Sequence, residues 1–287
     1  MLEESEIQGG ASAEAVQAHY DTGNAFYRLW LDPTLTYSCA LWDDATSLEE
    51  AQIAKLDHHV TESGAAGAAR VLDIGCGWGS VLDRLTRVHG VGRAVGLTLS
   101  EAQLKHIEEQ RLPNVEVRLE SWMDHQPDEP YDAIISIGAL EHFVRPETSS
   151  EDRIAIYRDF FRRCREMLRP GGLMSLQTMA YGGIGRFQAG ALGSIFPESD
   201  LPRLAELTEA LERQFEVVRL RNDPSHYART VRHWLDSFQR NREEVDLLLG
   251  EPRAREYERF LKSGIKGYDI GVFNLLRVTL RRVDLGD

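Results

Sequence analysis

The fold is decided by the stretch Val71-Leu72-Asp73-Ile74-Gly75-Cys76-Gly77-Trp78-Gly79. Its first half is apolar enough for a strand that is buried on both faces. Its glycines let the backbone turn sharply and come close to a ligand. A helical pattern follows from Ser80, and the amino end of a helix carries partial positive charge. Strand, glycine-rich turn and helix in this order predict the first unit of a Rossmann-like α/β domain.

The same alternation continues along the chain. Apolar runs predict strands at residues 70–74, 93–97, 114–119, 133–137 and 173–179, with helices over 80–88, 100–110 and 152–168 between them. Strands that alternate with helices indicate a mostly parallel sheet with right-handed crossovers. Two later strands, at 215–220 and 271–283, complete a seven-stranded sheet, and a helical pattern runs from His226 to about Leu261.

The regions around this core suggest five parts. Residues 1–12 are polar and small, which is typical of a disordered tail. We expect a helical amino-terminal cap at 13–66, a cofactor-binding core at 67–180, a lid insertion at 181–212, and at 213–287 the carboxy-terminal part of the core with substrate-side helices. The lid would lie over the carboxyl ends of the strands, where open α/β sheets bind ligands.

Composition excludes several classes of protein. The 287 residues carry a net charge of −13, which disfavours nucleic acid and anionic membrane surfaces as partners. The three cysteines are widely spaced, so neither a disulfide framework nor a metal site is expected. The first residues have no basic and apolar signal segment, and we therefore expect a cytoplasmic protein.

The glycine-rich turn does not fit a dinucleotide. Its spacing is G-x-G-x-G, and the second strand ends at Thr98 without an acidic residue for a ribose. Asp73 stands two residues before the first glycine, where a carboxylate suits the ammonium of a methionine moiety better than a pyrophosphate. The alternative is that Asp73 only ties the loop down by hydrogen bonds. The pattern favours S-adenosylmethionine as the cofactor.

Five ordered motifs resemble the cyclopropane-fatty-acid synthase and mycolic acid methyltransferase family. They are the glycine-rich segment 73–79, Gly96-Leu97-Thr98-Leu99-Ser100-Glu101-Ala102-Gln103, His19-Tyr20-Asp21-Thr22-Gly23-Asn24-Ala25-Phe26-Tyr27, Thr36-Tyr37-Ser38-Cys39-Ala40, and Ser136-Ile137-Gly138-Ala139-Leu140-Glu141-His142-Phe143. The similarity covers residues 13–180 well and the rest loosely.

The resemblance implies a set of cofactor contacts. The methionine carboxylate end would meet Tyr37 and Ser38, and the methionine backbone would lie along Gly75 and Gly77. Thr98 and Gln103 would hold the ribose. Trp122 would flank the adenine, unless it serves only in core packing.

The resemblance also implies chemistry at a carbon–carbon double bond. The family transfers a methyl group to an alkene, so the site must exclude water, stabilise a carbocation and remove a proton. Glu141 matches the glutamate that helps to bind a bicarbonate base. Cys39 and Tyr227 match residues that line the bicarbonate site, although Cys39 could equally be a small buried hydrophobe.

One departure from the family affects the expected substrate. Gln177 stands where the family has a histidine, and glutamine cannot be a cationic ligand of an anion. Glu141 itself is then an alternative base. With the acidic net charge, this departure favours C-methylation of an unsaturated small molecule, an isoprenoid or polyketide, over a membrane lipid. The alternatives are a cyclopropane synthase acting on unsaturated fatty acyl chains, and an N- or O-methyltransferase of a small metabolite.

Overall fold

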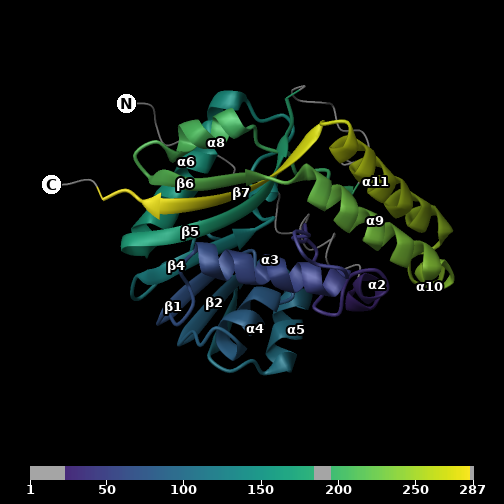
Figure 1. Cartoon of the computed structure of the whole chain (residues 1–287), viewed down its shortest axis with the longest axis horizontal. Helices are drawn as coiled ribbons and strands as arrows, with labels where there is room; N and C mark the ends of the chain where they lie inside the picture. The colour runs from purple at the N-terminus through teal and green to yellow at the C-terminus, as the bar shows by residue number, and fades with distance from the viewer. Residues whose placement is uncertain (1–22, 184–194, 285–287) are drawn as a thin grey trace.

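The computed structural model describes residues 23–183 and 195–284, which form a seven-stranded sheet with helices on both faces (Figure 1). The strand order is β3-β2-β1-β4-β5-β7-β6. Strands β1 to β5 pair in parallel, whereas β7 runs antiparallel to β5 and β6. The predicted seven-stranded, mostly parallel sheet is confirmed.

The elements have the following bounds. The strands are β1 (Arg70–Ile74), β2 (Arg93–Thr98), β3 (Val115–Leu119), β4 (Tyr131–Ile137), β5 (Leu168–Tyr181), β6 (Phe215–Asn222) and β7 (Phe273–Arg282). The helices are α2 (Asn24–Arg28), α3 (Leu48–Glu62), α4 (Ser80–Arg87), α5 (Glu101–Gln110), α6 (Ser150–Met167), α8 (Leu204–Leu211), α9 (Pro224–Arg240), α10 (Arg242–Leu249) and α11 (Glu251–Asp269). A short 3-10 turn, η1 (Leu140–His142), follows β4.

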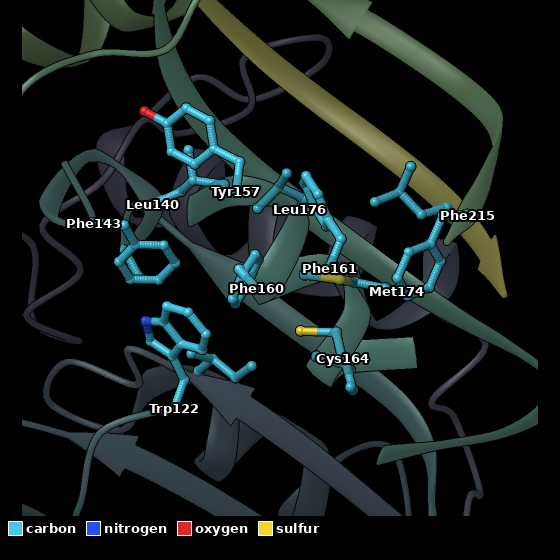
Figure 2. Close-up of a cluster of buried hydrophobic side chains, with 14 of the residues drawn as sticks. Trp122, Leu140, Phe143, Tyr157, Phe160, Phe161, Cys164, Met174, Leu176 and Phe215 are labelled. Atoms are coloured by element: carbon cyan, nitrogen blue, oxygen red, sulfur yellow. The ribbon is translucent and has the colours of Figure 1, made fainter. Parts of the chain in front are cut away.

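Side chains of β1 build a core on each face of the sheet. Val71 packs in a cluster with residues of α3, α4 and α5, whereas Leu72 and Ile74 belong to the cluster formed with α6 and α8. Successive side chains of a strand point to opposite faces, which explains the continuous apolar run in the sequence. Figure 2 shows the second core, where Phe160 and Phe161 of α6 lie among the strand side chains.

Beyond the carboxyl ends of the parallel strands stand α9, α10 and α11 (Figure 1). They enclose an aromatic cluster together with α2 and the segment that follows it. Phe26 lies 4.9 Å from Tyr257 and Trp30 lies 5.7 Å from Trp234, measured between ring centroids. Such edge-on ring pairs add stability beyond the area that they bury. The cluster holds α2 and the helices α9 to α11 together beside the same edge of the sheet.

One helical prediction is refined and another needs correction. The helical pattern expected from 226 to 261 is present and is divided among α9, α10 and α11, because the chain bends at Asn241 and at Gly250, whose φ is +76°. The expected helical cap at 13–66 contains a long non-helical stretch between α2 and α3. Its turn is made by the Asp32 carboxylate, which accepts hydrogen bonds from the backbone N–H groups of Thr34 (2.9 Å) and Thr36 (3.1 Å).

The lid expected at 181–212 lies partly outside the described residues, and the tail expected at 1–12 lies wholly outside them. Its last part does not act as a lid. Residues 204–211 form α8, and Leu207, Ala210 and Leu211 bury an i, i+3, i+4 stripe in the core beside α6. Arg158 of α6 also donates to the carbonyl of Glu209 over 3.1 Å. This segment therefore belongs to the helical layer on one face of the sheet.

Candidate active site

A cavity opens at the carboxyl ends of β1, β2 and β4, and it brings together every residue expected to contact the cofactor. Its wall includes Tyr37, Ser38, Asp73, Gly75, Gly77, Thr98, Gln103 and Trp122. These residues come from four separate segments of the chain. Their meeting at the strand ends follows from the parallel order of β2, β1 and β4.

The glycine turn after β1 forms the floor of this cavity. The N–H groups of Gly75 and Cys76 both donate to the Leu97 carbonyl over 3.0 Å, which ties the turn to the end of β2. Gly75 has a φ of +79°, and a Cβ atom there would lie 2.6 Å from the Cβ of Ala139. Gly77 has a φ of +54° but open space around it. Both glycines are needed for conformation, and Gly75 is also needed for close packing.

These two glycines support a matched prediction about stability. Gly75→Ala should lower the free energy of unfolding by about 3 kcal/mol, because positive φ and a steric clash both act there. Gly77→Ala should lower it by only about 1 kcal/mol, because only φ is unfavourable. Urea unfolding without ligand measures both. Equal losses in the two variants would contradict the packing argument for Gly75.

Asp73 ends β1 as a buried carboxylate. Within residues 23–183 and 195–284, its Oδ2 atom has no hydrogen-bond partner. Burial raises the pKa of Asp73 to about 7, and the nearby Lys55 charge opposes this rise. A buried carboxylate with a free oxygen at a cavity wall is well placed to accept a cationic group. If Asp73 only tied down the loop, that oxygen would be expected to have a partner in the turn.

Two further contacts shape the wall after β2. Thr98 Oγ1 donates to Gln103 Oε1 over 2.7 Å, so the two residues expected at the ribose lie side by side. Ser100 caps α5, as the sequence predicts, and its hydroxyl accepts from the Gln103 N–H. Trp122 is placed for both of the roles expected from the sequence, adenine contact and core packing. It lines the cavity, and its ring centroid also lies 5.1 Å from Phe143 and 5.2 Å from Phe160. Figure 2 shows Trp122 and Phe143 at one end of the core.

The wall on the other side is held by α3, which the sequence analysis did not connect with the site. Gln52 donates through Nε2 to the carbonyls of Thr36 (3.1 Å) and Ser38 (2.9 Å). Lys55, one turn later, donates to Ser38 Oγ over 3.0 Å and lines the cavity. The sequence did contain a signal for these residues. Gln52 and Lys55 form a polar pair three residues apart on a helix that otherwise packs in the core.

Glu141 lies next to the cavity and not in its wall. The turn after β4 gives Gly138, Ala139 and His142 to the wall, while the Glu141 side chain reaches towards β5. There Glu141 Oε1 accepts from the Met179 N–H over 2.6 Å. Its Oε2 atom is buried and has no hydrogen-bond partner in the described part of the chain. Burial raises the pKa of this carboxyl to about 7.

Cys39 and Gln177 meet at a buried arginine that the sequence analysis missed. Arg277 of β7 donates through Nε to Gln177 Oε1 (2.9 Å) and through Nη2 to the Ala40 carbonyl (3.0 Å). The same Nη2 atom lies 3.4 Å from Cys39 Sγ, and Nη1 pairs with Asp223. Burial raises the pKa of Cys39 to about 11, so it is a thiol at neutral pH. The signal for Arg277 was a charge within an apolar, alternating strand.

Tyr227 stands on α9, where its ring centroid lies 4.8 Å from Tyr268 of α11. The Tyr268 hydroxyl is buried without a hydrogen-bond partner among the residues described. Burial raises the pKa of Tyr268, and Tyr227, Cys39 and Glu141 add smaller effects in the same direction. Tyr268 therefore lies close to Tyr227 and interacts electrostatically with Cys39 and Glu141, although it was not among the residues selected from the sequence.

No three histidine, cysteine, aspartate or glutamate side chains of residues 23–183 and 195–284 are grouped so that they could hold a metal ion. In the same ranges, no helix is both long and apolar enough to cross a bilayer.

The chain is similar to known proteins in both sequence and structure. Residues 8–278 match the family model of mycolic acid cyclopropane synthetase. Cyclopropane mycolic acid synthase MmaA2 of Mycobacterium tuberculosis is 35% identical, over 94% of this chain and 97% of its own. The solved structure of MmaA2 superposes with a TM-score of 0.86 at 31% identity, over 97% of this chain and all of the other.

Two further structures separate family from fold. Cyclopropane synthase CmaA1, complexed with SAH and CTAB, gives a TM-score of 0.85 at 31% identity, over 95% of this chain and 99% of its own. Geranyl diphosphate C-methyltransferase of Streptomyces coelicolor A3(2) superposes with a TM-score of 0.68 at 18% identity, over 94% of this chain and 98% of its own. This similarity shows a shared fold only. The chain therefore has the class I methyltransferase fold and belongs to the mycolic acid cyclopropane synthetase family of S-adenosylmethionine-dependent methyltransferases.

Proposed function

We propose that this enzyme methylates a carbon–carbon double bond in the acyl chain of a lipid and then closes a cyclopropane ring. The observation that carries the proposal is Glu141, a buried carboxylate with an unpartnered oxygen beside the cofactor cavity. An N- or O-methyltransferase acts on a nucleophile with a lone pair and has no carbocation to stabilise. It has less use for a buried carboxylate next to aromatic side chains.

This proposal reverses the preference for a small isoprenoid or polyketide substrate. That preference rested on the net charge and on Gln177. Net charge describes the whole surface and not a site at the sheet edge. Gln177 accepts a hydrogen bond from buried Arg277, so positive charge remains next to the position where the family has histidine. The relatives named for mycolic acid synthesis then make a long acyl chain the better candidate.

The residues of this chain suggest how each chemical need is met. Bound S-adenosylmethionine supplies an electrophilic methyl group. As the new carbon–carbon bond forms, positive charge develops on the substrate, and the rings of Tyr227 and Tyr268 together with Glu141 can stabilise it. Glu141, ionised above its pKa of about 7, then removes a proton from the transferred methyl group. The electron pair left on that carbon closes the ring.

Bicarbonate as the base is a second candidate that fits the same residues. Glu141 Oε2 and the Tyr268 hydroxyl are two buried polar atoms without partners in the described residues, and Cys39 lies nearby. A protonated Glu141 and Tyr268 would donate to the anion. Gln177 would contribute little directly, since its oxygen already accepts from Arg277 and His59 (3.3 Å) and its amide faces the Cys39 carbonyl (3.4 Å). Assays with and without bicarbonate in carbon-dioxide-free buffer separate the two bases.

The test of the proposed reaction is mass spectrometry of lipids from a bacterial host that lacks its own cyclopropane synthase and expresses this chain. We expect acyl chains that gain one CH2 unit and lose one double bond, with cyclopropane protons in the NMR spectrum. The Glu141→Gln variant is the matched control and should leave the lipids unchanged. Unmodified lipids with an expressed protein that binds S-adenosylmethionine would count against the lipid substrate, and a methylated amine or hydroxyl group would identify the other reaction class.

A further inference from the structure

A buried lysine completes one end of the cofactor cavity. Lys55 on α3 is 1% exposed and donates to Ser38 Oγ over 3.0 Å. It lines the cavity together with Tyr37, Ser38 and Asp73. None of the sequence motifs includes Lys55.

The helix fixes the position of this side chain. The α3 helix starts at a capping box, in which Ser47 and Glu50 satisfy each other's backbone N–H groups. One turn further, Gln52 binds the carbonyls of Thr36 and Ser38, so the face of α3 that carries Lys55 is tied to the cavity wall. The ammonium is therefore held in place before any ligand enters, which reduces the entropy lost on binding.

Among the described residues, no carboxylate forms a hydrogen bond or ion pair with the Lys55 ammonium. Lys55 is the one lysine or arginine in the cavity wall, as far as residues 23–183 and 195–284 show. Asp73 and Asp32 act on it as opposite charges, whereas Arg277 repels it. Burial of an ammonium is costly unless it is paired, and within residues 23–183 and 195–284 Lys55 Nζ donates to a neutral hydroxyl, that of Ser38. An anionic group in the cavity would complete the pairing.

We propose that Lys55, with Ser38, binds the α-carboxylate of the methionine moiety while Asp73 binds its α-ammonium. The proposal deepens the cofactor assignment and rests on it. An amino-acid zwitterion presents both charges on one carbon, and the cavity wall offers Lys55 for the carboxylate and Asp73 for the ammonium. Because Ser38 Oγ accepts a hydrogen bond from Lys55 Nζ, its own hydroxyl hydrogen remains available to donate to the carboxylate.

Calorimetry with two ligands tests this assignment without any substrate. The ligands are S-adenosylhomocysteine and its decarboxylated analogue, which keeps the amine but lacks the carboxylate. The wild-type protein should bind the first about 30-fold or more tightly, as expected for a buried charge pair. Lys55→Met should remove most of this preference by weakening only the first ligand. Lys55→Gln, a polar replacement, should behave in the same way and serves if the first variant does not fold.

Gln52→Met is the matched control. It removes two hydrogen bonds from the same wall but no charge, so any loss of affinity should be similar for both ligands and the preference should remain. The proposal is overturned if the wild type shows no preference, or if the Lys55 variants weaken both ligands equally or neither. Failure of the lipid reaction would leave these affinities unaffected, so the two proposals can fail separately.

Discussion

Glu141→Gln should lower the turnover number by about a hundredfold to ten-thousandfold, which is the usual contribution of a positioned acid or base. Cofactor affinity should stay near the wild-type value, because the Glu141 side chain points to β5 and does not line the cofactor cavity. Glutamine keeps the shape of glutamate but cannot ionise. Single-turnover measurement of product with saturating cofactor tests the rate, and calorimetry tests the affinity.

The pH profile separates a proton-transfer role from a structural one. Burial raises the pKa of Glu141 to about 7, so its base form is lost as the pH falls below 7. Wild-type turnover at saturating cofactor should therefore rise with pH and level off above about 7. The residual rate of Glu141→Gln should lack this step. Glu147→Gln, an exposed glutamate six residues later, is the control and should keep both rate and profile. A Glu141→Gln enzyme with near-normal turnover would rule out the assigned role.

Asp73→Asn should weaken binding of S-adenosylhomocysteine by about 30-fold to several thousandfold, since it leaves a buried ammonium without its carboxylate. The unligated protein should not lose stability at pH 8. The pKa of Asp73 is raised from 3.8 to about 7 in the folded state, so its cost to folding grows as the pH rises from 3.8 to about 7 and stays constant above that, and asparagine removes the effect. Thermal unfolding at pH 6 and pH 8 checks this sign.

Asp83→Asn provides the control for that variant. Asp83 lies on α4 just after the glycine turn and pairs with Arg87 on the surface (3.1 Å). A surface pair contributes little, so affinity should not change. Unchanged affinity in Asp73→Asn as well would remove the ammonium from the proposed cofactor contacts.

Local sequence signals predicted the parallel half of the fold closely. Residues 70–74 form β1 as expected, and Ser100 caps α5, because a buried strand and a capping hydroxyl are decided by neighbours in the chain. The positions of the breaks within the carboxy-terminal helices were missed, since Asn241 and Gly250 can also occur within helices. The break at Asn241 is fixed by a distant contact, because its side-chain amide donates to the Leu29 carbonyl at the end of α2. β5 begins at Leu168 and not at 173, because the segment that ends α6 pairs directly with β4.

Some residues of the candidate site could be predicted from the sequence, and others could not. Residues such as Asp73 and Glu141 belong to recognisable motifs at strand ends, so their positions could be predicted. Lys55 and Arg277 lie in segments whose patterns indicate only a core helix and a strand. Their importance depends on which segments the fold brings next to Ser38, 17 residues before Lys55, and next to Gln177, 100 residues before Arg277.

The place of β7 in the sheet has a consequence for biosynthesis. This strand is made after β1 to β6, yet it lies between β5 and β6 and carries Arg277. A nascent chain that ends before residue 273 can assemble the sheet from β3 to β5, but it has no partner for β6 and no charge behind Gln177. The cofactor cavity can thus form on the ribosome, whereas the buried contact of Gln177 with Arg277 forms only when synthesis of this strand is complete. An incomplete chain would present the cavity without the buried charge beside Gln177.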